Sequence, residues 1–511
     1  MKPYYITTPL YYVNARSHIG HAYTNILCDT FARWRKFLGE EVFFLTGTDE
    51  HGTKIDRAAR EQGMDPKTYV DQMVPQFQEL WRVLGIEYDF FIRTTDEEHK
   101  KIVQQVLKTL EAKSEIYRSS YKGWYCTPCE SFWTKLQLVN SKCPDCKRDV
   151  QELGEENYFF KLSKYQQWLI QYLNEHPEFV QPEIRKNEIL GFLREPLEDL
   201  CITRPRSRLA WGIDYPTSKD HVVYVWFDAL INYVSAVKYG VDEKKFKSIW
   251  PADVHMVGKD ILRQHAVYWP IMLKACGIEM PRTVMAHGWW TMEGSKVSKS
   301  RGNVVDPADL VKRYGTDALR YYFLHETRLG MDGAYSEDLL IERFNSDLAN
   351  DLGNLVFRAT SMLERYFSLK IPVLSIKKQD DEIDRQCTSL REQSLSLLKL
   401  ISETMERFEP QGAIDAIWAV IRSGNRFVEQ TKPWVLAKEK KMDSLSLVLT
   451  TLLESIRLTS MMLTPFLPVS SQKILDLFGV GQRPQARDFK WGSLTPGFCV
   501  KKGEPLFPKV E

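Results

Sequence analysis

Two short segments of the sequence carry basic side chains at spacings that suit phosphate chemistry. His18 and His21 lie three residues apart at the start of a helical pattern, so they share one face of its first turn. Lys296 and Lys299 lie on a short loop bordered by serine and glycine. Imidazole N–H groups stabilise phosphate oxygens whose charge grows in a transition state, and two mobile ammonium groups suit a leaving pyrophosphate. Either segment alone fits an ordinary basic surface, but the pair favours nucleotide chemistry.

Four of the nine cysteines form a second chemical cluster. Cys126 and Cys129, followed by Cys143 and Cys146, make the pattern CxxC-x13-CxxC. Each CxxC turn can direct two thiolates at one ion, and four thiolates close a tetrahedral shell with no open position. Two disulfides are the alternative, although an odd total and five scattered cysteines argue against a complete disulfide framework. The pattern therefore predicts one structural zinc ion per chain.

The N-terminal third has the alternating elements that position such groups. Residues 4–7 form a strand-like apolar run, residues 19–38 have helical periodicity, and residues 41–45 form a second strand-like run. Strand signals return at residues 222–227 and 254–258. This β-α-β order predicts an α/β fold, a Rossmann-type doubly wound parallel sheet that binds phosphate where a strand leads into a helix.

Changes in composition divide the chain into five expected parts. Residues 116–225 carry the clustered cysteines, many aromatic residues and breaks at proline and glycine, so they are expected to split the sheet as an insertion. From about Glu337, apolar residues recur at three- and four-residue spacing without strand signals, which predicts an all-α bundle. The expected domains are residues 1–115, the first half of the catalytic domain; 116–225, a connective insertion with the zinc knuckle; 226–336, the second half of the catalytic domain with the lysine loop; 337–483, the helical domain; and 484–511, a tail that packs back on the body.

The bulk composition is that of an ordinary globular protein. The 511 residues are 43% hydrophobic and 27% charged, and 69 basic against 67 acidic residues leave a net charge of +2. This balance gives no bulk signal for nucleic acid, so an RNA partner must bind through local patches. The best membrane-spanning candidate, residues 445–467, carries Glu454 and Arg457, and no secretory signal is visible. We therefore expect a cytoplasmic protein with no membrane partner.

Read together, these segments resemble the methionyl-tRNA synthetase family of class I aminoacyl-tRNA synthetases. Residues 18–21 match the HIGH signature letter for letter, and residues 296–300 match KMSKS with Val297 in place of methionine. Residues 9–14, 47–52 and 225–233 also resemble the family, as do residues 258–261 with His265, and the resemblance covers essentially the whole chain. The cysteine pattern resembles the family's single-knuckle insertion.

The spacing separates this family from close relatives. The interval from His21 to Lys296 is 275 residues (296 − 21), too short for the large editing insertion of the leucine, isoleucine and valine enzymes. Cysteinyl-tRNA synthetase is nearer in size, but its zinc ligands surround the amino-acid pocket, whereas these four cysteines share one 21-residue stretch (126–146).

The resemblance assigns roles by position. The ATP phosphates would be stabilised by His18, His21, Lys296 and Lys299, and ATP would further contact Gly20, Val297, Gly258, Asp260 and, as a weaker candidate, Asp214. The methionine side chain would be lined by Leu10, Tyr12, Trp226, Ala229, Tyr233, Ile261 and His265, while Asp49 would take the α-ammonium group. The tRNA anticodon would be read by Asn354, Arg358 and Trp434. Zinc would be held by Cys126, Cys129, Cys143 and Cys146.

The implied activity is methionine–tRNA ligation. Methionine's carboxylate would attack the α-phosphorus of Mg²⁺-bound ATP, release pyrophosphate and leave methionyl-adenylate, whose methionyl group would pass to the 3′ end of tRNA(Met). The expected partners are methionine, ATP, Mg²⁺, one Zn²⁺ and tRNA(Met). A monomer is expected, because residues 505–508 end the chain where family members with an added dimerising domain continue. Two alternatives stay open: a class I synthetase for another amino acid, and a non-catalytic RNA-binding paralogue.

Overall fold

The computed structural model describes residues 2–127, 131–133, 135–292, 295–296, 305–374, 381–481, 483–501 and 505–510. The chain forms two compact units. The sheet unit contains residues 1–24, 42–81 and 87–288, and the helical unit contains residues 25–41, 82–86 and 289–511. The division falls within helix α1, Ile19–Phe37.

A seven-stranded sheet forms the centre of the sheet unit, in the order β2-β3-β1-β12-β13-β8 with β4 also paired to β3. Its strands are β1 Tyr4–Thr7, β2 Tyr11–Tyr12, β3 Val42–Asp49, β4 Phe90–Arg93, β8 Val180–Gln181, β12 Val254–Gly258 and β13 Thr283–His287. Every pairing is parallel, and Ile6 lies opposite both Phe44 and Val254. Strands β12 and β13 are buried throughout, as parallel strands covered on both faces must be. The predicted Rossmann-type sheet is confirmed.

Helices of the sheet unit connect these strands. Besides the start of α1, they are α2 Thr53–Glu61, α3 Pro66–Val83, α4 Glu97–Ala112, α5 Gln166–Glu175, α6 Glu183–Phe192, α7 Val225–Leu230, α8 Asn232–Ser235, α9 Glu243–Ile249 and α10 Trp269–Cys276. The 3-10 turn Lys259–Ile261 and the π-helical turn Gln264–Tyr268 follow β12.

One predicted strand was wrong in extent and in place. Strand β11, His221–Val223, ends before Tyr224 and pairs antiparallel with β10, Thr203–Pro205, in a separate two-stranded sheet. From Val225 the chain is helix α7, which buries Val225, Phe227 and Leu230. A short run of β-branched and aromatic residues suits a buried strand and a buried helix equally, so periodicity alone could not separate them.

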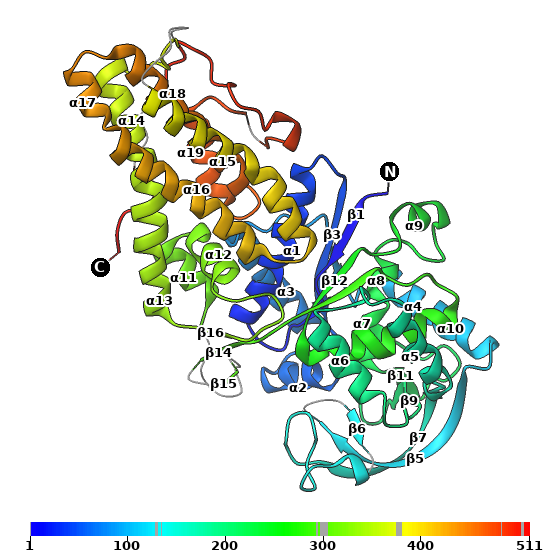
Figure 1. Cartoon of the computed structure of the whole chain (residues 1–511). Coiled ribbons are helices and arrows are strands. Elements are labelled where there is room, and N and C mark those ends of the chain that lie inside the picture. The colour runs from blue at the N-terminus through cyan, green and yellow to red at the C-terminus, as the bar shows by residue number, and fades with distance from the viewer. Residues whose placement is uncertain are drawn as a thin grey trace. The chain divides into compact units, whose positions relative to one another are not determined.

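An antiparallel sheet interrupts the parallel one along the sequence. Its order is β6-β5-β7-β9, with β5 Ile116–Cys126, β6 Ser131–Trp133, β7 Gln151–Phe160 and β9 Leu200–Cys201. The long β5–β7 pair is drawn in cyan in Figure 1; Cys126 is the last residue of β5, and Cys143 and Cys146 follow in the segment that connects β5 to β7. A small cluster of Cys126, Trp133 and Cys143 is buried there, apart from the main core.

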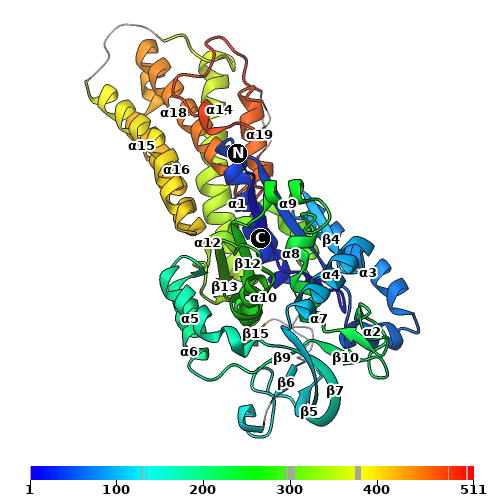
Figure 2. The same cartoon turned by 90° about the vertical axis from the view of Figure 1, so that its right-hand side faces the viewer.

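The helical unit is built mainly from long helices. They are α11 Pro307–Tyr314, α12 Thr316–His325, α13 Glu337–Arg343, α14 Asn354–Phe367, α15 Asp381–Glu406, α16 Pro410–Thr431, α17 Pro433–Lys438, α18 Met442–Leu463 and α19 Pro468–Leu477, with the π-helical segment Phe344–Gly353 between α13 and α14. Helices α15 and α16 run side by side in both views (Figures 1 and 2). A small sheet joins β14 Trp290–Met292 to β15 Ser295–Lys296 and β16 Gly333–Ala334. The predicted all-α bundle is confirmed.

Helix α18 is the one described helix that is long and apolar enough to cross a membrane. Its apolar window is 89% buried inside the bundle, so α18 is a core helix in this fold. Glu454 and Arg457 form a buried ion pair of 2.7 Å on this helix. The Glu454 carboxylate also accepts a hydrogen bond from the Leu494 N–H at 2.6 Å, so the charged pair holds the C-terminal segment against the bundle.

Candidate functional site

The two histidines lie at the first turn of α1, close enough for their rings to stack. The ring centroids of His18 and His21 are 3.8 Å apart. The Gly20 N–H donates to His18 Nδ1 at 3.1 Å, and the His18 N–H donates to His21 Nδ1 at 3.4 Å. Because a nitrogen that accepts a hydrogen bond carries no proton, the neutral form of each ring is protonated on Nε2. Two Nε2–H donors at a helix start suit phosphate oxygens.

Gly20 has a local structural reason to lack a side chain. A Cβ atom at this position would stand 2.9 Å from His18 Cε1 and would displace the imidazole ring. The same helical turn is tied to the sheet, because Thr24 Oγ1 lies 2.8 Å from Nε2 of His287, which ends β13. The contact of ATP with Gly20 stays a prediction.

The lysine loop is only partly described. Lys296 ends strand β15, where its backbone lies opposite Thr291 of β14. The Lys296 side chain, Val297 and Lys299 lie outside the described residues. Their predicted contacts with ATP are therefore carried by the sequence match.

Four of the seven residues predicted to line the methionine side chain form one aromatic group. The Tyr12 and Trp226 rings meet edge to face at 6.4 Å, and the Trp226 and His265 rings at 6.5 Å. Tyr233 lies against His265 at 5.7 Å. The remaining three are near the same core: Leu10 and Ile261 pack against it, and Ala229 is buried on α7. Aromatic walls of this kind suit a flexible thioether side chain.

The protonation of His265 follows from its contacts. His265 Nδ1 lies 2.8 Å from the Ile261 carbonyl oxygen, so Nδ1 carries the proton and donates it. Nε2 then accepts a hydrogen bond from the Tyr233 hydroxyl at 2.7 Å. Burial lowers the pKa of His265 to about 4. The imidazole is therefore neutral and gives the aromatic group an uncharged side.

We predict that this histidine makes the fold acid-sensitive. An unfolded histidine titrates near pH 6.5 and the folded one near pH 4, so the unfolded state binds more protons between these values. The contribution of His265 to the free energy of unfolding is therefore fully present above pH 6.5. As the pH falls from 6.5 toward 4, the free energy of unfolding decreases by up to about 1.4 kcal/mol per pH unit. Urea denaturation at pH 7 and pH 5 measures this loss. A His265→Gln variant should lose less over the same interval, and an equal loss in both proteins would contradict the assignment.

Asp49 lies beside the aromatic group at the end of β3. It is buried, and its Cα is the register partner of Tyr12 on β2. The predicted ammonium-binding carboxylate and the predicted pocket wall therefore come from adjacent parallel strands. Lys54 of α2 lies over the Tyr12 ring, with Nζ 4.4 Å from the ring centroid.

Sequence reasoning missed the residue that follows Asp49. The Glu50 carboxylate is fully buried and accepts hydrogen bonds from Thr48 and Thr95, both at 2.6 Å. Arg93 adds a two-pronged ion pair at 2.7 and 2.8 Å. Burial alone would lower the pKa of Arg93, but the hydrogen bonds to Glu50 raise it. This network anchors the chain directly after Asp49. The signal in the sequence was an acidic residue directly after the largely apolar strand β3.

Two of the residues predicted to contact ATP, Gly258 and Asp260, lie at and just after the end of β12. A Cβ atom on Gly258 would stand 2.7 Å from Asp260 Oδ1. Any residue other than glycine would therefore displace the Asp260 carboxylate. Asp214 is placed differently. It bridges to Val222 of β11, and its carboxylate pairs with the exposed side chain of Arg206.

Three of the four predicted zinc ligands come together beyond the β5–β7 hairpin. The Sγ atoms of Cys126, Cys143 and Cys146 all lie within 4.8 Å of one another, and those of Cys126 and Cys146 are 3.4 Å apart. Thiolates bound to one tetrahedral zinc ion stand about 3.8 Å apart, given Zn–S bonds of about 2.3 Å. The three thiols therefore fit zinc. Cys129 lies outside the described residues.

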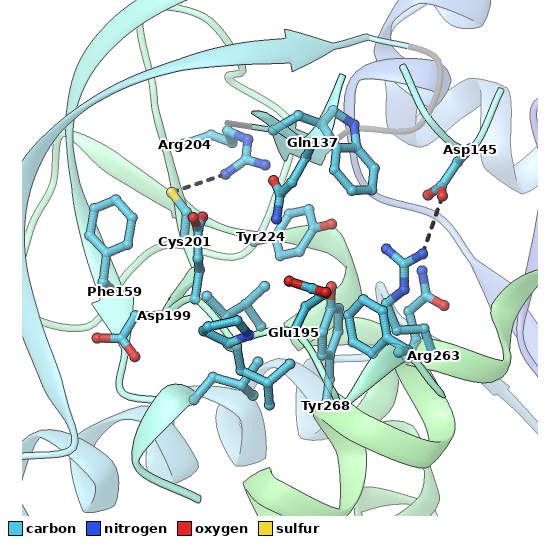
Figure 3. Close-up of a pocket in the computed structure, with 18 residues that line it drawn as sticks. Gln137, Asp145, Phe159, Glu195, Asp199, Cys201, Arg204, Tyr224, Arg263 and Tyr268 are labelled. Atoms are coloured by element: carbon cyan, nitrogen blue, oxygen red, sulfur yellow. Dashed lines mark hydrogen bonds and ion pairs between the residues drawn. The ribbon is translucent and has the colours of Figure 1, made fainter. Parts of the chain in front are cut away.

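The thiol cluster also contacts the segment that carries the pocket histidine. Asp145, between Cys143 and Cys146, lies 3.2 Å from Arg263 Nη2 (Figure 3). The Arg263 guanidinium stacks over Phe192 at 4.6 Å and over Trp133 at 5.6 Å. These groups line a cavity of about 140 Å³. Arg263 lies two residues from both Ile261 and His265. The contact of Asp145 with Arg263 therefore supports the turn that contains these two residues.

The predicted anticodon residues lie in the helical unit. Asn354 and Arg358 of α14 line a hollow of about 410 Å³ together with Asn350, Asp351, Asn425, Arg426, Glu429 and Gln430. Arg358 pairs with Glu429 at 2.6 Å. Trp434, on the short helix that follows α16, is 42% exposed, which is unusual for an indole in a packed bundle. Amide side chains and an exposed indole ring are both groups that suit single-stranded bases.

Comparison with known proteins gives a consistent result over the full length. Residues 4–154 and 150–360 match the family model "tRNA synthetases class I (M)", and residues 379–511 match "Anticodon binding domain of methionyl tRNA ligase". The methionine–tRNA ligases of Caldanaerobacter subterraneus subsp. tengcongensis and Clostridium acetobutylicum are each 47% identical over 100% of the chain, covering 79% and 78% of those proteins. A solved structure of Mycobacterium tuberculosis methionyl-tRNA synthetase in complex with methionyl-adenylate aligns with a TM-score of 0.93 at 37% identity, over 99% of this chain and 100% of that one.

Proposed function

This chain belongs to the methionyl-tRNA synthetase family of class I aminoacyl-tRNA synthetases, and we propose which of its residues carry each step of the family reaction. It is a methionine–tRNA ligase, which activates methionine with ATP and transfers the methionyl group to tRNA. The observation that carries the proposal is the match over the whole chain to a structure holding methionyl-adenylate, together with the intact histidine pair.

Activation needs the two substrates to be held in line. Asp49 takes the α-ammonium group of methionine, and the group formed by Tyr12, Trp226, Tyr233 and His265 surrounds the thioether, with Leu10, Ala229 and Ile261 completing the wall. A buried neutral His265 suits an uncharged side chain, because a charged wall would have to be desolvated without a partner. The same wall would reject charged amino acids.

The phosphate end of the site stabilises charge that develops during the reaction. The carboxylate of methionine attacks the α-phosphorus of Mg²⁺-bound ATP, the bond to the leaving pyrophosphate breaks, and methionyl-adenylate forms. The Nε2–H groups of His18 and His21, with the ammonium groups of Lys296 and Lys299, oppose the growing charge on the phosphate oxygens. No general base is required, since the attacking carboxylate is already ionised. Gly258 and Asp260 hold the ATP ribose; Asp214 stays a weaker candidate.

The anticodon is read by the hollow on the helical unit. We predict that Trp434→Ala raises the KM for tRNA(Met) by roughly 5- to 150-fold, because stacking on an aromatic ring contributes about 1–3 kcal/mol per base. Tritiated-methionine charging assays measure this change. ATP–pyrophosphate exchange without tRNA should be unaffected. Leu395→Ala, which removes an exposed apolar side chain from α15, is the matched control; an equal effect in the control would contradict a specific role for Trp434.

Zinc is assigned to the cysteine knuckle as a structural ion held by Cys126, Cys129, Cys143 and Cys146. We predict one zinc ion per chain by elemental analysis. Cys143→Ser should lose the ion, because a hydroxyl is a poor ligand for zinc beside thiolates. Hydrogen exchange should then rise along the β5–β7 hairpin and at the Arg263 turn while the parallel sheet stays protected. Full zinc occupancy in the serine variant would contradict the assignment.

The five-part division expected from the sequence stands as the proposed domain scheme, with the knuckle in residues 116–225 and the anticodon domain in residues 337–483. The enzyme is proposed to act as a monomer in the cytoplasm, where its substrates tRNA and ATP meet. Light scattering of the purified chain tests the monomer.

One experiment tests the function as a whole. ATP–pyrophosphate exchange is measured with each amino acid in turn, without tRNA. Exchange with methionine alone is expected. Exchange with another amino acid would overturn the pocket assignment, and no exchange by folded, zinc-loaded protein would favour the RNA-binding alternative.

A further inference from the structure

A buried hydrogen-bonded bridge crosses the sheet unit close to the methionine pocket. His51 Nδ1 lies 2.7 Å from Asp228 Oδ2, and His99 Nε2 lies 2.8 Å from Asp228 Oδ1. The other nitrogen of His99, Nδ1, lies 2.7 Å from the Ser235 hydroxyl. All four side chains are buried, and Asp228 has no exposed surface.

The protons of this bridge can be placed. A carboxylate only accepts, so both histidines donate to Asp228, while the Ser235 hydroxyl lies 2.7 Å from His99 Nδ1 and donates to the Asn232 carbonyl oxygen at 3.3 Å. Burial alone would raise the pKa of Asp228, but the hydrogen bonds and charge of His51 and His99 bring it below its ordinary value. Asp228 is thus a carboxylate with one histidine donor on each oxygen.

The bridge joins two parts of the proposed pocket that are distant in sequence. His51 follows Asp49 by two residues, on the side of the ammonium group. Asp228 lies on α7 between Trp226 and Ala229, on the side of the thioether. No role above uses either residue. The hydrogen bond therefore connects the two walls that must grip the two ends of one substrate.

We propose that His51 and Asp228 are positioning residues that set the distance between the ammonium-binding wall and the thioether-binding wall. This inference rests on the proposed function. Methionine gains affinity from both ends only if the two walls are spaced for its length, and a displacement of about 1 Å is enough to weaken such a site about 100-fold. His99 and Ser235 anchor the far end of the bridge on α4 and α8.

The test separates positioning from simple stability. Asp228→Asn keeps the size of the side chain but turns one acceptor into a donor, so one histidine link is lost. We expect the KM for methionine in pyrophosphate exchange to rise 10- to 100-fold, with the KM for ATP within about twofold of the wild type. Equal rises in both KM values would overturn the proposal.

A methionine analogue that lacks the ammonium group distinguishes positioning from a general loss of structure. A general loss of structure would not change the preference of the enzyme for methionine over this analogue. 4-(Methylthio)butanoate has methionine's side chain and carboxylate but cannot use Asp49. Its inhibition constant should change little in Asp228→Asn, so the preference of the wild type for methionine over this analogue should shrink at least tenfold. An unchanged preference would overturn the proposal.

Variants at His51 keep the proposal testable if Asp228→Asn does not fold. The amide N–H of an asparagine overlays His Nδ1–H, so His51→Asn should retain a near-normal KM for methionine, whereas His51→Leu should raise it at least tenfold. The same KM in both would overturn the proposal. His176→Asn is the matched control, because His176 pairs with Glu178 at 3.3 Å on the surface. Wild-type enzyme that exchanges no pyrophosphate with methionine would instead refute the proposed function.

Discussion

His21→Ala should lower the kcat of methionine-dependent pyrophosphate exchange by about 100- to 1,000-fold and leave the KM for ATP within a few-fold of the wild type. A donor aimed at a developing charge contributes mainly in the transition state, and losing one such donor typically has this cost. His21 is held for this task, since its Nδ1 accepts from the His18 N–H and its ring stacks on that of His18. Steady-state exchange kinetics at saturating methionine measure the effect.

Two amide variants show which nitrogen acts. Glutamine places an N–H close to the position of Nε2, and asparagine places one at the position of Nδ1. Because Nε2 is the protonated nitrogen of neutral His21, His21→Gln should recover part of the lost kcat and His21→Asn should recover little. The reverse order would contradict the tautomer. A loss seen only in the KM for ATP would contradict transition-state stabilisation.

Asp49→Asn is expected to reduce kcat/KM for methionine by roughly 30-fold or more. The variant removes one charge of a buried pair, which costs about 2 kcal/mol or more, and 1.4 kcal/mol corresponds to a factor of ten. Asp49 is buried at the end of β3, beside Tyr12. Water therefore cannot readily solvate the ammonium group of methionine in place of the lost carboxylate. The measurement is pyrophosphate exchange over a range of methionine concentrations.

The same variant should treat the desamino analogue as the wild type does, because that ligand has no ammonium group to lose. Asp220→Asn, which changes an exposed carboxylate of the same unit, is the control and should behave as the wild type. An unchanged kcat/KM for methionine in Asp49→Asn would remove the residue from the site and would also weaken the case for the His51–Asp228 bridge.

Local sequence signals were enough to predict the strands and the helix around the histidine pair. The apolar run at residues 4–7 and the periodic run after His18 predicted β1 and α1, and residues 254–258 predicted β12, because period and burial are written in neighbouring residues. The same reasoning failed at residues 225–227, where helix α7 replaces the predicted strand. Strand β13 was not anticipated at all, although it is buried throughout and its His287 holds the first turn of α1.

Residue types at short spacing were enough to identify the family and to mark the HIGH-type segment, the KMSKS-type segment and the cysteine pattern. How residues distant in sequence meet follows from the folded structure. The hydrogen bond from His51 to Asp228 joins residues 177 positions apart. The ring contact between Tyr12 and Trp226 joins residues that are also far apart in the sequence. Spacing cannot report such pairs, because which strand lies beside which depends on the packing of the whole sheet unit. The protonation of His265 and the buried network of Glu50 follow from that packing as well.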